Sequence, residues 1–112
     1  MKRGEVWTAA GGEAYVGKPR PVLVLQDDRF DATDSVTTCP FTSDPTTAAF
    51  RVAVEASPAN GLRNRSFAMT DKISSLPRTR LRDRIGRVDS ADMAKVNRAV
   101  FVFLGLAGAD RR

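Results

Sequence analysis

Four arginines stand at every second position in the sequence and could bind phosphate together. They are Arg78, Arg80, Arg82 and Arg84. In an extended segment, alternate residues point to the same face of the chain, so these guanidinium groups would share one face. Such a row attracts the phosphates of a nucleic acid, but charged side chains also protect an exposed strand edge from unwanted pairing. The spacing therefore predicts either a phosphate-binding face or a protected edge.

The sequence contains no histidine, and this excludes several kinds of active site. It rules out a Ser-His-Asp triad, a Cys-His nucleophile pair, a histidine-ligated metal and a pair of imidazoles for acid-base catalysis. The only cysteine, Cys39, excludes an internal disulfide and a cysteine-rich zinc site, and we expect it to be a small buried apolar residue. Any catalysis must therefore use other groups.

A cluster of aspartates offers the one alternative based on a metal ion. The cluster comprises Asp27, Asp28, Asp31 and Asp34, and it lies in a single polar connection. Neither a helical nor a strand register gathers these carboxylates around one point, as metal coordination requires. Metal-dependent nuclease chemistry is therefore the least favoured interpretation, and we expect no metal or other cofactor.

Length and composition are typical of one globular domain spanning residues 1–112. Of these residues, 42% are hydrophobic and 28% are charged, and no apolar run reaches the roughly 20 residues needed to span a bilayer. We expect no signal peptide and no membrane partner, and therefore a cytoplasmic location. The net charge of +5 suits a polyanionic partner.

Hydrophobic patterning predicts five or six short strands followed by one helix. The run PVLVLQ at 21–26 is almost continuously apolar, which is typical of a strand buried on both faces. A proline interrupts the run at 36–41, and residues 42–45 should form the turn that follows. The remaining strands are expected at 6–9, at 50–56, within 66–76 and at 84–88.

The last segment changes to helical spacing. Ser90 is a plausible N-cap, and the helix should end at Gly105. Phe101 and Val102 lie off its apolar stripe, which suggests that a second face of the helix is also covered, for example by another subunit. The pattern as a whole predicts a mostly β protein with a C-terminal helix, built on a small, strongly bent antiparallel sheet or barrel.

Five segments, in order, resemble the MazF/PemK family of toxin endoribonucleases from type II toxin-antitoxin systems. They are RGEVW at 3–7, KPRPVLVLQ at 18–26, TCPFTSD at 38–44, MTDKISSLPRTRL at 69–81 and IGRVDSADMAKVNRAVFVFLGL at 85–106. The match covers nearly the whole chain. The sequence departs from the family pattern in the loop at 9–18, which is shorter, and at Ser74, where arginine is common. The cleavage sequence of a relative is therefore not transferred to this chain.

The resemblance implies a small SH3-like (CcdB/MazF-like) barrel of five to seven strands and a homodimer whose interface forms an RNA groove. It implies sequence-specific cleavage of single-stranded RNA without a metal, and neutralisation by a cognate antitoxin. The catalytic arginine and its hydroxyl partner fall on Arg20 and Thr42. The other residues expected to contact RNA are Glu13, Tyr15, Lys18, Ser43, Asp71, Lys72 and Arg78.

RNA supplies its own nucleophile, because the 2′-hydroxyl can attack the adjacent phosphorus and expel the next 5′-oxygen. A guanidinium such as that of Arg20 presents a planar fork to two phosphate oxygens, where negative charge builds in the transition state. Thr42 can donate a further hydrogen bond or hold the ribose in line. The general base is open among Arg20, Glu13 and Asp71, since a charged guanidinium is a poor base near neutral pH.

Two rival functions share this fold. A non-enzymatic toxin resembling CcdB would poison DNA gyrase by binding it, with its decisive residues on the terminal helix, where GLAGADRR offers no evident anchor cluster. A plain RNA-binding barrel would need only the basic excess. The Arg20 and Thr42 pair favours the nuclease.

Overall fold

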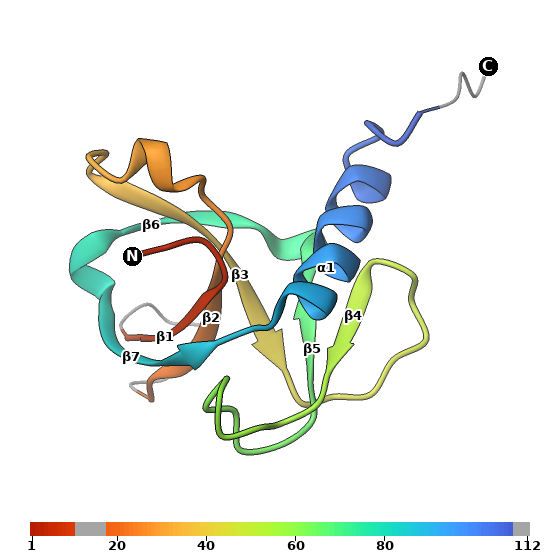
Figure 1. Ribbon diagram of the computed structural model, residues 1–112, viewed down its shortest axis with the longest axis horizontal. Coiled ribbons are helices and arrows are strands. Elements are labelled where there is room, and N and C mark those ends of the chain that lie inside the picture. Colours follow the sequence, from red (N-terminus) through yellow and green to blue (C-terminus); the bar gives the residue numbers. More distant parts are fainter. Residues whose placement is uncertain (11–17, 109–112) are drawn as a thin grey trace.

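The computed structural model describes residues 1–10 and 18–108. In these residues, seven strands form one bent antiparallel sheet, and a single α-helix follows them (Figure 1). The strands are β1 Glu5–Ala9, β2 Arg20–Val24, β3 Ser35–Thr42, β4 Arg51–Val54, β5 Ser66–Met69, β6 Ser74–Pro77 and β7 Leu81–Arg87. The helices are α1 Ser90–Phe103 and the short 3-10 turns η2 Asp28–Phe30, η3 Thr70–Lys72 and η4 Arg78–Arg80. The expectation of a mostly β protein with a C-terminal helix is confirmed.

The strand order along the sheet is β4-β5-β3-β2-β1-β7, and β6 pairs with β3 beside this path. The long β3 holds the sheet together, because its first half pairs with β6, its middle with β2 and its last two residues with β5. The two terminal strands of the path, β4 and β7, do not pair with each other. The described strands therefore curl into a barrel-like sheet that is not closed.

Each face of the curled sheet carries its own apolar core. One core lies under α1, where Val96 and Ala99 of the helix belong to the same buried cluster as Leu23 of β2. The other core lies on the opposite face and includes Val22 and Val24 of β2. Alternate residues of a strand point to opposite faces, so β2 contributes to both cores. This confirms that β2 is buried on both faces, although the strand ends at Val24.

Two expectations about strands were wrong. The segment 66–76 holds two strands separated by η3, because the chain leaves β5, turns, and returns along the first half of β3 as β6. Pro40 does not interrupt β3, which continues to Thr42. Pro40 pairs with Val22 at the point where the other edge of β3 changes partner from β6 to β5, and a residue without an N–H is tolerated there.

The row of four arginines is also not a continuous extended face. Arg78 and Arg80 lie in η4, and only Arg82 and Arg84 lie in β7. The 3-10 turn breaks the alternation that would have aligned the four side chains. A shared phosphate-binding face over all four residues is therefore excluded.

Helix α1 begins one residue earlier than expected. The N-cap is Asp89, whose side chain accepts a hydrogen bond from the backbone N–H of Asp92, and Ser90 is the first helical residue. Aspartate satisfies a free N–H group and places negative charge at the positive end of the helix. At the other end, Phe101, Val102 and Leu104 are exposed, which leaves an uncovered apolar surface. Within the described ranges, no helix is long and apolar enough to cross a membrane.

Candidate functional site

Arg20 and Thr42 lie on neighbouring strands at the same end of the sheet. Arg20 is the first residue of β2, Thr42 is the last of β3, and Val22 pairs with Pro40 between the two strands. Continuing this register by two residues brings Arg20 opposite Thr42. Side chains of directly opposite residues emerge from the same face, with Cβ atoms about 5 Å apart. The β2–β3 register therefore places the two residues expected to be catalytic at the same end of neighbouring strands.

The backbone directs the hydroxyl of Thr42. Its Oγ1 accepts a hydrogen bond of 3.2 Å from the backbone N–H of Asp44, in the turn that follows β3. A threonine hydroxyl has one hydrogen to donate and can accept through its oxygen. Since the Asp44 N–H occupies an acceptor position, the hydroxyl hydrogen remains available to a group beside Thr42. Thr42 is the last residue of β3, whereas the sequence pattern predicted it to be part of the turn at 42–45.

Asp71 forms an ion pair that the sequence analysis did not predict. Its two carboxylate oxygens accept hydrogen bonds from Nε and Nη2 of Arg51, at 2.7 and 2.9 Å. The strand expected at 50–56 includes Arg51, but its sequence gave no sign of the partner. Thr70 contacts Phe50 through both its N–H and its hydroxyl, which fastens η3 to the start of β4. Asp71 is thereby held beside Arg51.

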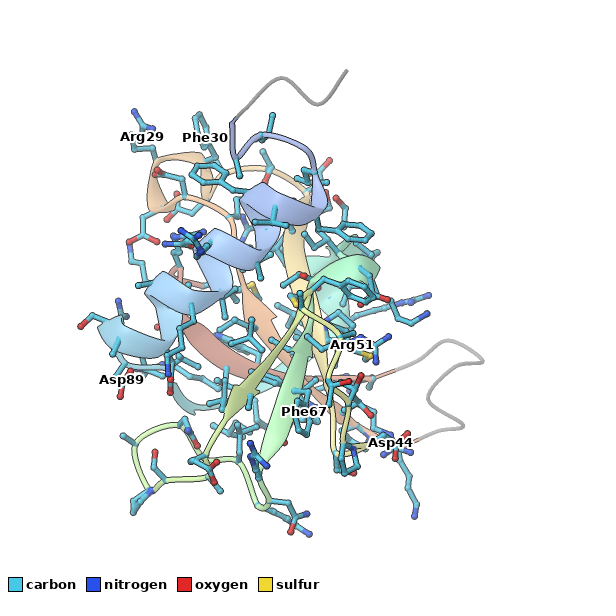
Figure 2. All side chains as sticks on the ribbon, turned by 90° about the vertical axis from the view of Figure 1, so that its right-hand side faces the viewer. Arg29, Phe30, Asp44, Arg51, Phe67 and Asp89 are labelled. Carbon is cyan, nitrogen blue, oxygen red and sulfur yellow. The ribbon has the colours of Figure 1, made fainter. Side chains whose placement is uncertain are left out.

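The ion pair belongs to the face of the sheet that carries Thr42. Thr42 pairs with Phe67 of β5, and Phe67 pairs with Ala53 of β4. Arg51 lies two residues from Ala53, so strand alternation places it on the same face. Figure 2 shows Arg51, Phe67 and Asp44 on one side of the molecule, with Arg29 at the far end.

The carboxyl of Asp71 and the thiol of Cys39, near η3, have shifted pKa values. The hydrogen bonds from Arg51 lower the pKa of Asp71 from its usual value, although partial burial acts in the opposite direction. Burial raises the pKa of the Cys39 thiol to about 12, and the negative charge of Asp71 adds to this effect. Asp71 is therefore a weaker base than an isolated carboxylate. Cys39 is a buried thiol, as expected, with no exposed surface.

The other residues expected to contact RNA fall into three groups. Lys18 and Ser43 are exposed and flank Arg20 and Thr42, and Lys72 is exposed next to Asp71. Arg78 is not brought to this end, because its guanidinium contacts the carbonyl of Thr33 before β3, at the opposite end of that strand from Thr42. Glu13 and Tyr15 lie outside the described residues.

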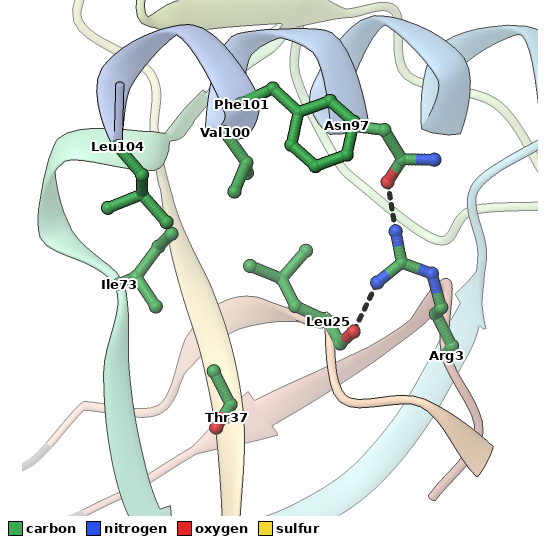
Figure 3. A pocket seen from close by; sticks show the side chains of 8 residues that line it. All are labelled: Arg3, Leu25, Thr37, Ile73, Asn97, Val100, Phe101 and Leu104. Atoms are coloured by element: carbon green, nitrogen blue, oxygen red, sulfur yellow. Dashed lines mark hydrogen bonds between the residues drawn. The ribbon is translucent and has the colours of Figure 1, made fainter. Parts of the chain in front are cut away.

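A groove with a volume of about 430 Å³ lies on the helix side of the sheet, away from the face of Arg20 and Thr42 (Figure 3). The Arg3 guanidinium donates hydrogen bonds to the carbonyl of Leu25 and to Oδ1 of Asn97 at one end of it. The rest of the lining is mainly apolar and comprises Thr37, Ile73, Val100, Phe101 and Leu104. Neither Arg20 nor Thr42 contributes to this groove. In residues 1–10 and 18–108, no three acidic or cysteine side chains converge as metal ligands.

Comparison with known proteins decides the family. Residues 2–104 match the family described as PemK-like, MazF-like toxins of type II toxin-antitoxin systems. The chain belongs to this family. A probable endoribonuclease MazF of Mycolicibacterium smegmatis is 52% identical over 109 residues, which cover 96% of this chain and all of the relative. Endoribonuclease MazF9 of Mycobacterium tuberculosis is 33% identical and covers 95% of this chain, at 98% of its own length.

Solved structures agree with this assignment of the toxin. An endoribonuclease from a mycobacterial species, in complex with its cognate antitoxin, matches with a TM-score of 0.82 and 27% identity, covering 97% of this chain and 99% of its own. The Mycobacterium tuberculosis toxin MazF-mt6 matches with a TM-score of 0.80 and 25% identity, covering 93% and 99%. The expected family and the toxin endoribonuclease class are confirmed, and these relatives do not support the CcdB-like alternative.

Proposed function

We propose that this toxin cuts single-stranded RNA with Arg20 and Thr42 at the scissile phosphate and without a metal ion. The observation that supports the proposal is the position of Arg20 at the start of β2 and of Thr42 at the end of the neighbouring β3. The named endoribonuclease relatives support the reaction class. We expect the natural target to be messenger RNA, with transfer RNA and ribosomal RNA as alternatives, and its cleavage to inhibit translation and growth.

The reaction uses the 2′-hydroxyl of the RNA itself. Its oxygen attacks the adjacent phosphorus, the bond from phosphorus to the next 5′-oxygen breaks, and the proton of the 2′-hydroxyl passes to a base while the 5′-oxygen takes up another. Arg20 stabilises the charge that builds on the non-bridging oxygens. Thr42 donates its hydroxyl hydrogen to the same group, because the Asp44 N–H already occupies its oxygen.

Lys18 and Ser43 are well placed to hold the phosphates on either side of the scissile bond, because both are exposed beside the catalytic pair. A lysine that neutralises phosphate charge increases the affinity for RNA, and this contribution falls as the salt concentration rises. Glu13 and Tyr15 remain proposed RNA contacts in the loop between β1 and β2. Arg78 also remains a proposed RNA contact, at the opposite end of β3 from Thr42.

We also propose two protein partners in the cytoplasm. One is a cognate antitoxin, supported by the structural relative solved with its own antitoxin. The other is a second copy of the chain, supported by the exposed apolar side chains at the end of α1. An exposed apolar surface of this kind is typical of a protein–protein contact.

The test is incubation of purified toxin with a long single-stranded RNA in excess EDTA, with the fragment ends mapped. Wild type should cut at a few short sequences and leave 5′-hydroxyl ends. Arg20→Ala should lower the rate about a hundredfold or more, and Thr42→Val about tenfold, with the fold intact by circular dichroism. Cleavage that requires added Mg²⁺, or that survives Arg20→Ala unchanged, would overturn the proposal.

A further inference from the structure

The Arg51–Asp71 pair differs from every other ion pair in the described part of the chain. Its side chains are 20% and 18% exposed, whereas each of the other pairs has at least one partner that is more than half exposed. The contact is bidentate, because one planar guanidinium donates a hydrogen bond to each of the two carboxylate oxygens. Such a pair fixes orientation as well as charge. A surface ion pair formed by chance would have neither property.

The position of the pair makes it relevant to RNA. It lies on the face of Thr42, about two strand spacings, or roughly 10 Å, across the sheet from β3. That is close to the reach of one nucleotide from a phosphate held at Arg20 and Thr42. A free carboxylate at this distance would repel the RNA backbone. Arg51 offsets that charge and leaves the pair close to neutral.

Pairing with Arg51 leaves some hydrogen-bond acceptor positions of the Asp71 carboxylate unused. Two carboxylate oxygens offer about four acceptor positions, and Arg51 occupies one on each oxygen. The remaining positions can accept hydrogen bonds from base edges, and the amino groups of adenine, cytosine and guanine are the strongest such donors. A carboxylate reads an amino group in this way when it accepts from cytosine N4. The pair is therefore suited to read a base.

We propose that Arg51 is a positioning residue that holds the Asp71 carboxylate so that it accepts a hydrogen bond from the amino group of one RNA base beside the scissile phosphate. This inference rests on the proposed function. It assigns Asp71 to base recognition and removes it from the candidates for the general base, because both its oxygens face a guanidinium. Arg51 acts through Asp71 and does not itself contact the RNA.

Charged and titratable groups around Asp71 come from several elements. Arg51 reaches it from β4, and Lys72 is its neighbour in η3. The buried thiol of Cys39 in β3 is close enough for their charges to interact, and Asp44 acts on Arg51 from the turn after β3. Of these, only Arg51 forms an ion pair with the carboxylate among the described residues. Loss of Arg51 should therefore raise the pKa of Asp71. Any recognition that such a variant retains should then be lost, as the pH falls, at a higher pH than in wild type.

The experiment measures kcat/KM for an RNA oligonucleotide carrying the mapped target sequence and for a set in which single amino groups are deleted, such as inosine for guanosine. In wild type, one deletion should cost roughly ten- to a hundredfold. Arg51→Met and Asp71→Asn should each lose this discrimination at that one position, and the double variant should be no worse than either. Arg51→Lys, which keeps the charge but not the bidentate contact, should retain part of the discrimination.

Matched measurements separate the alternatives. Arg29→Met removes an exposed ion pair at the far end of the molecule and should change nothing. If Arg51 bound phosphate directly, the two single effects would add and the salt slope of binding would fall by about one, which would overturn the inference. A purely structural role would lower kcat/KM equally for all oligonucleotides and at every pH, which would also overturn it. Failure of wild type to cut any RNA would instead overturn the proposed function.

Discussion

The indole N–H of Trp7 donates a hydrogen bond of 3.0 Å to Oε1 of Glu5, two residues earlier on the same face of β1. The same carboxylate accepts a hydrogen bond from the backbone N–H of Lys2 and pairs with Arg84 of β7. Glu5 thus ties the chain start and β7 to β1. Burial acts to raise the pKa of Glu5, but these three partners together lower it below its usual value.

Glu5 should therefore make the fold sensitive to acid. A carboxyl whose pKa is lower in the folded state stabilises the fold fully above its unfolded pKa, and this contribution is lost as the pH falls through the folded pKa. Glu5→Gln should lower the free energy of unfolding by about 1 kcal/mol at pH 7 and have less effect at pH 3. Urea unfolding at both pH values measures this, with Glu55→Gln, an exposed pair, as the control. An effect of equal size at both pH values would contradict the account.

Gly86 should not tolerate a side chain. A Cβ at this position would lie 2.3 Å from the backbone carbon of Asn60 and 2.4 Å from the oxygen of Ala59. This close approach of β7 to the turn before β5 requires glycine, so Gly86→Ala should cost about 2 kcal/mol or more. Thermal unfolding measures the loss, and Arg82→Ala, at an exposed position of the same strand, should cost under about 0.5 kcal/mol. Equal melting temperatures for the two variants would refute the packing.

The thiol of Cys39 should be inert in the native protein. Burial, with a smaller contribution from Asp71, raises its pKa to about 12, and its side chain has no exposed surface. Because the thiolate is the reactive form, labelling with a thiol reagent at pH 8 should be at least a hundredfold slower than in guanidinium chloride. Rapid stoichiometric labelling of folded protein would show that β3 opens locally.

The end of α1 should mediate self-association. Phe101, Val102 and Leu104 are about half exposed there, an apolar surface that a monomer leaves in water. Phe101→Glu should convert a dimer to a monomer in light scattering at micromolar concentration. Ala94→Glu, on an exposed position nearer the start of the same helix, should leave the mass unchanged. A monomeric wild type would remove the basis for a dimer through this surface.

Local patterns predicted most of the secondary structure. PVLVLQ indicated a strand buried on both faces, and residues of β2 do contribute to both cores. Helical spacing predicted the start of α1 to within one residue and its end to within two, because capping and periodicity are local properties. The turn at η3 was missed, since SFAMTDKISSL contains neither glycine nor proline to mark the break. What divides β5 from β6 is the change of partner along β3, which only tertiary structure decides.

The candidate site was predictable in a different way. Arg20 and Thr42 came from the family resemblance, and their placement at the same end of neighbouring strands depends on the β2–β3 register. Arg51 was out of reach, because its partner Asp71 lies 20 residues away and joins it only through pairing of β4 with β5. The expected alternation of Arg78 with Arg80 was wrong because it assumed an extended chain, whereas η4 is helical there.

The most direct test of the central claim is cleavage of a mapped RNA oligonucleotide in which the scissile nucleotide alone carries 2′-deoxyribose. If the 2′-hydroxyl is the nucleophile and Arg20 and Thr42 only stabilise its attack, wild-type toxin should not cut at that nucleotide. A deoxyribose two nucleotides away should leave the rate within a few-fold of the all-ribose control. Undiminished cutting at the deoxy position would show that water or a protein side chain attacks instead, and the account of Arg20 and Thr42 would be wrong.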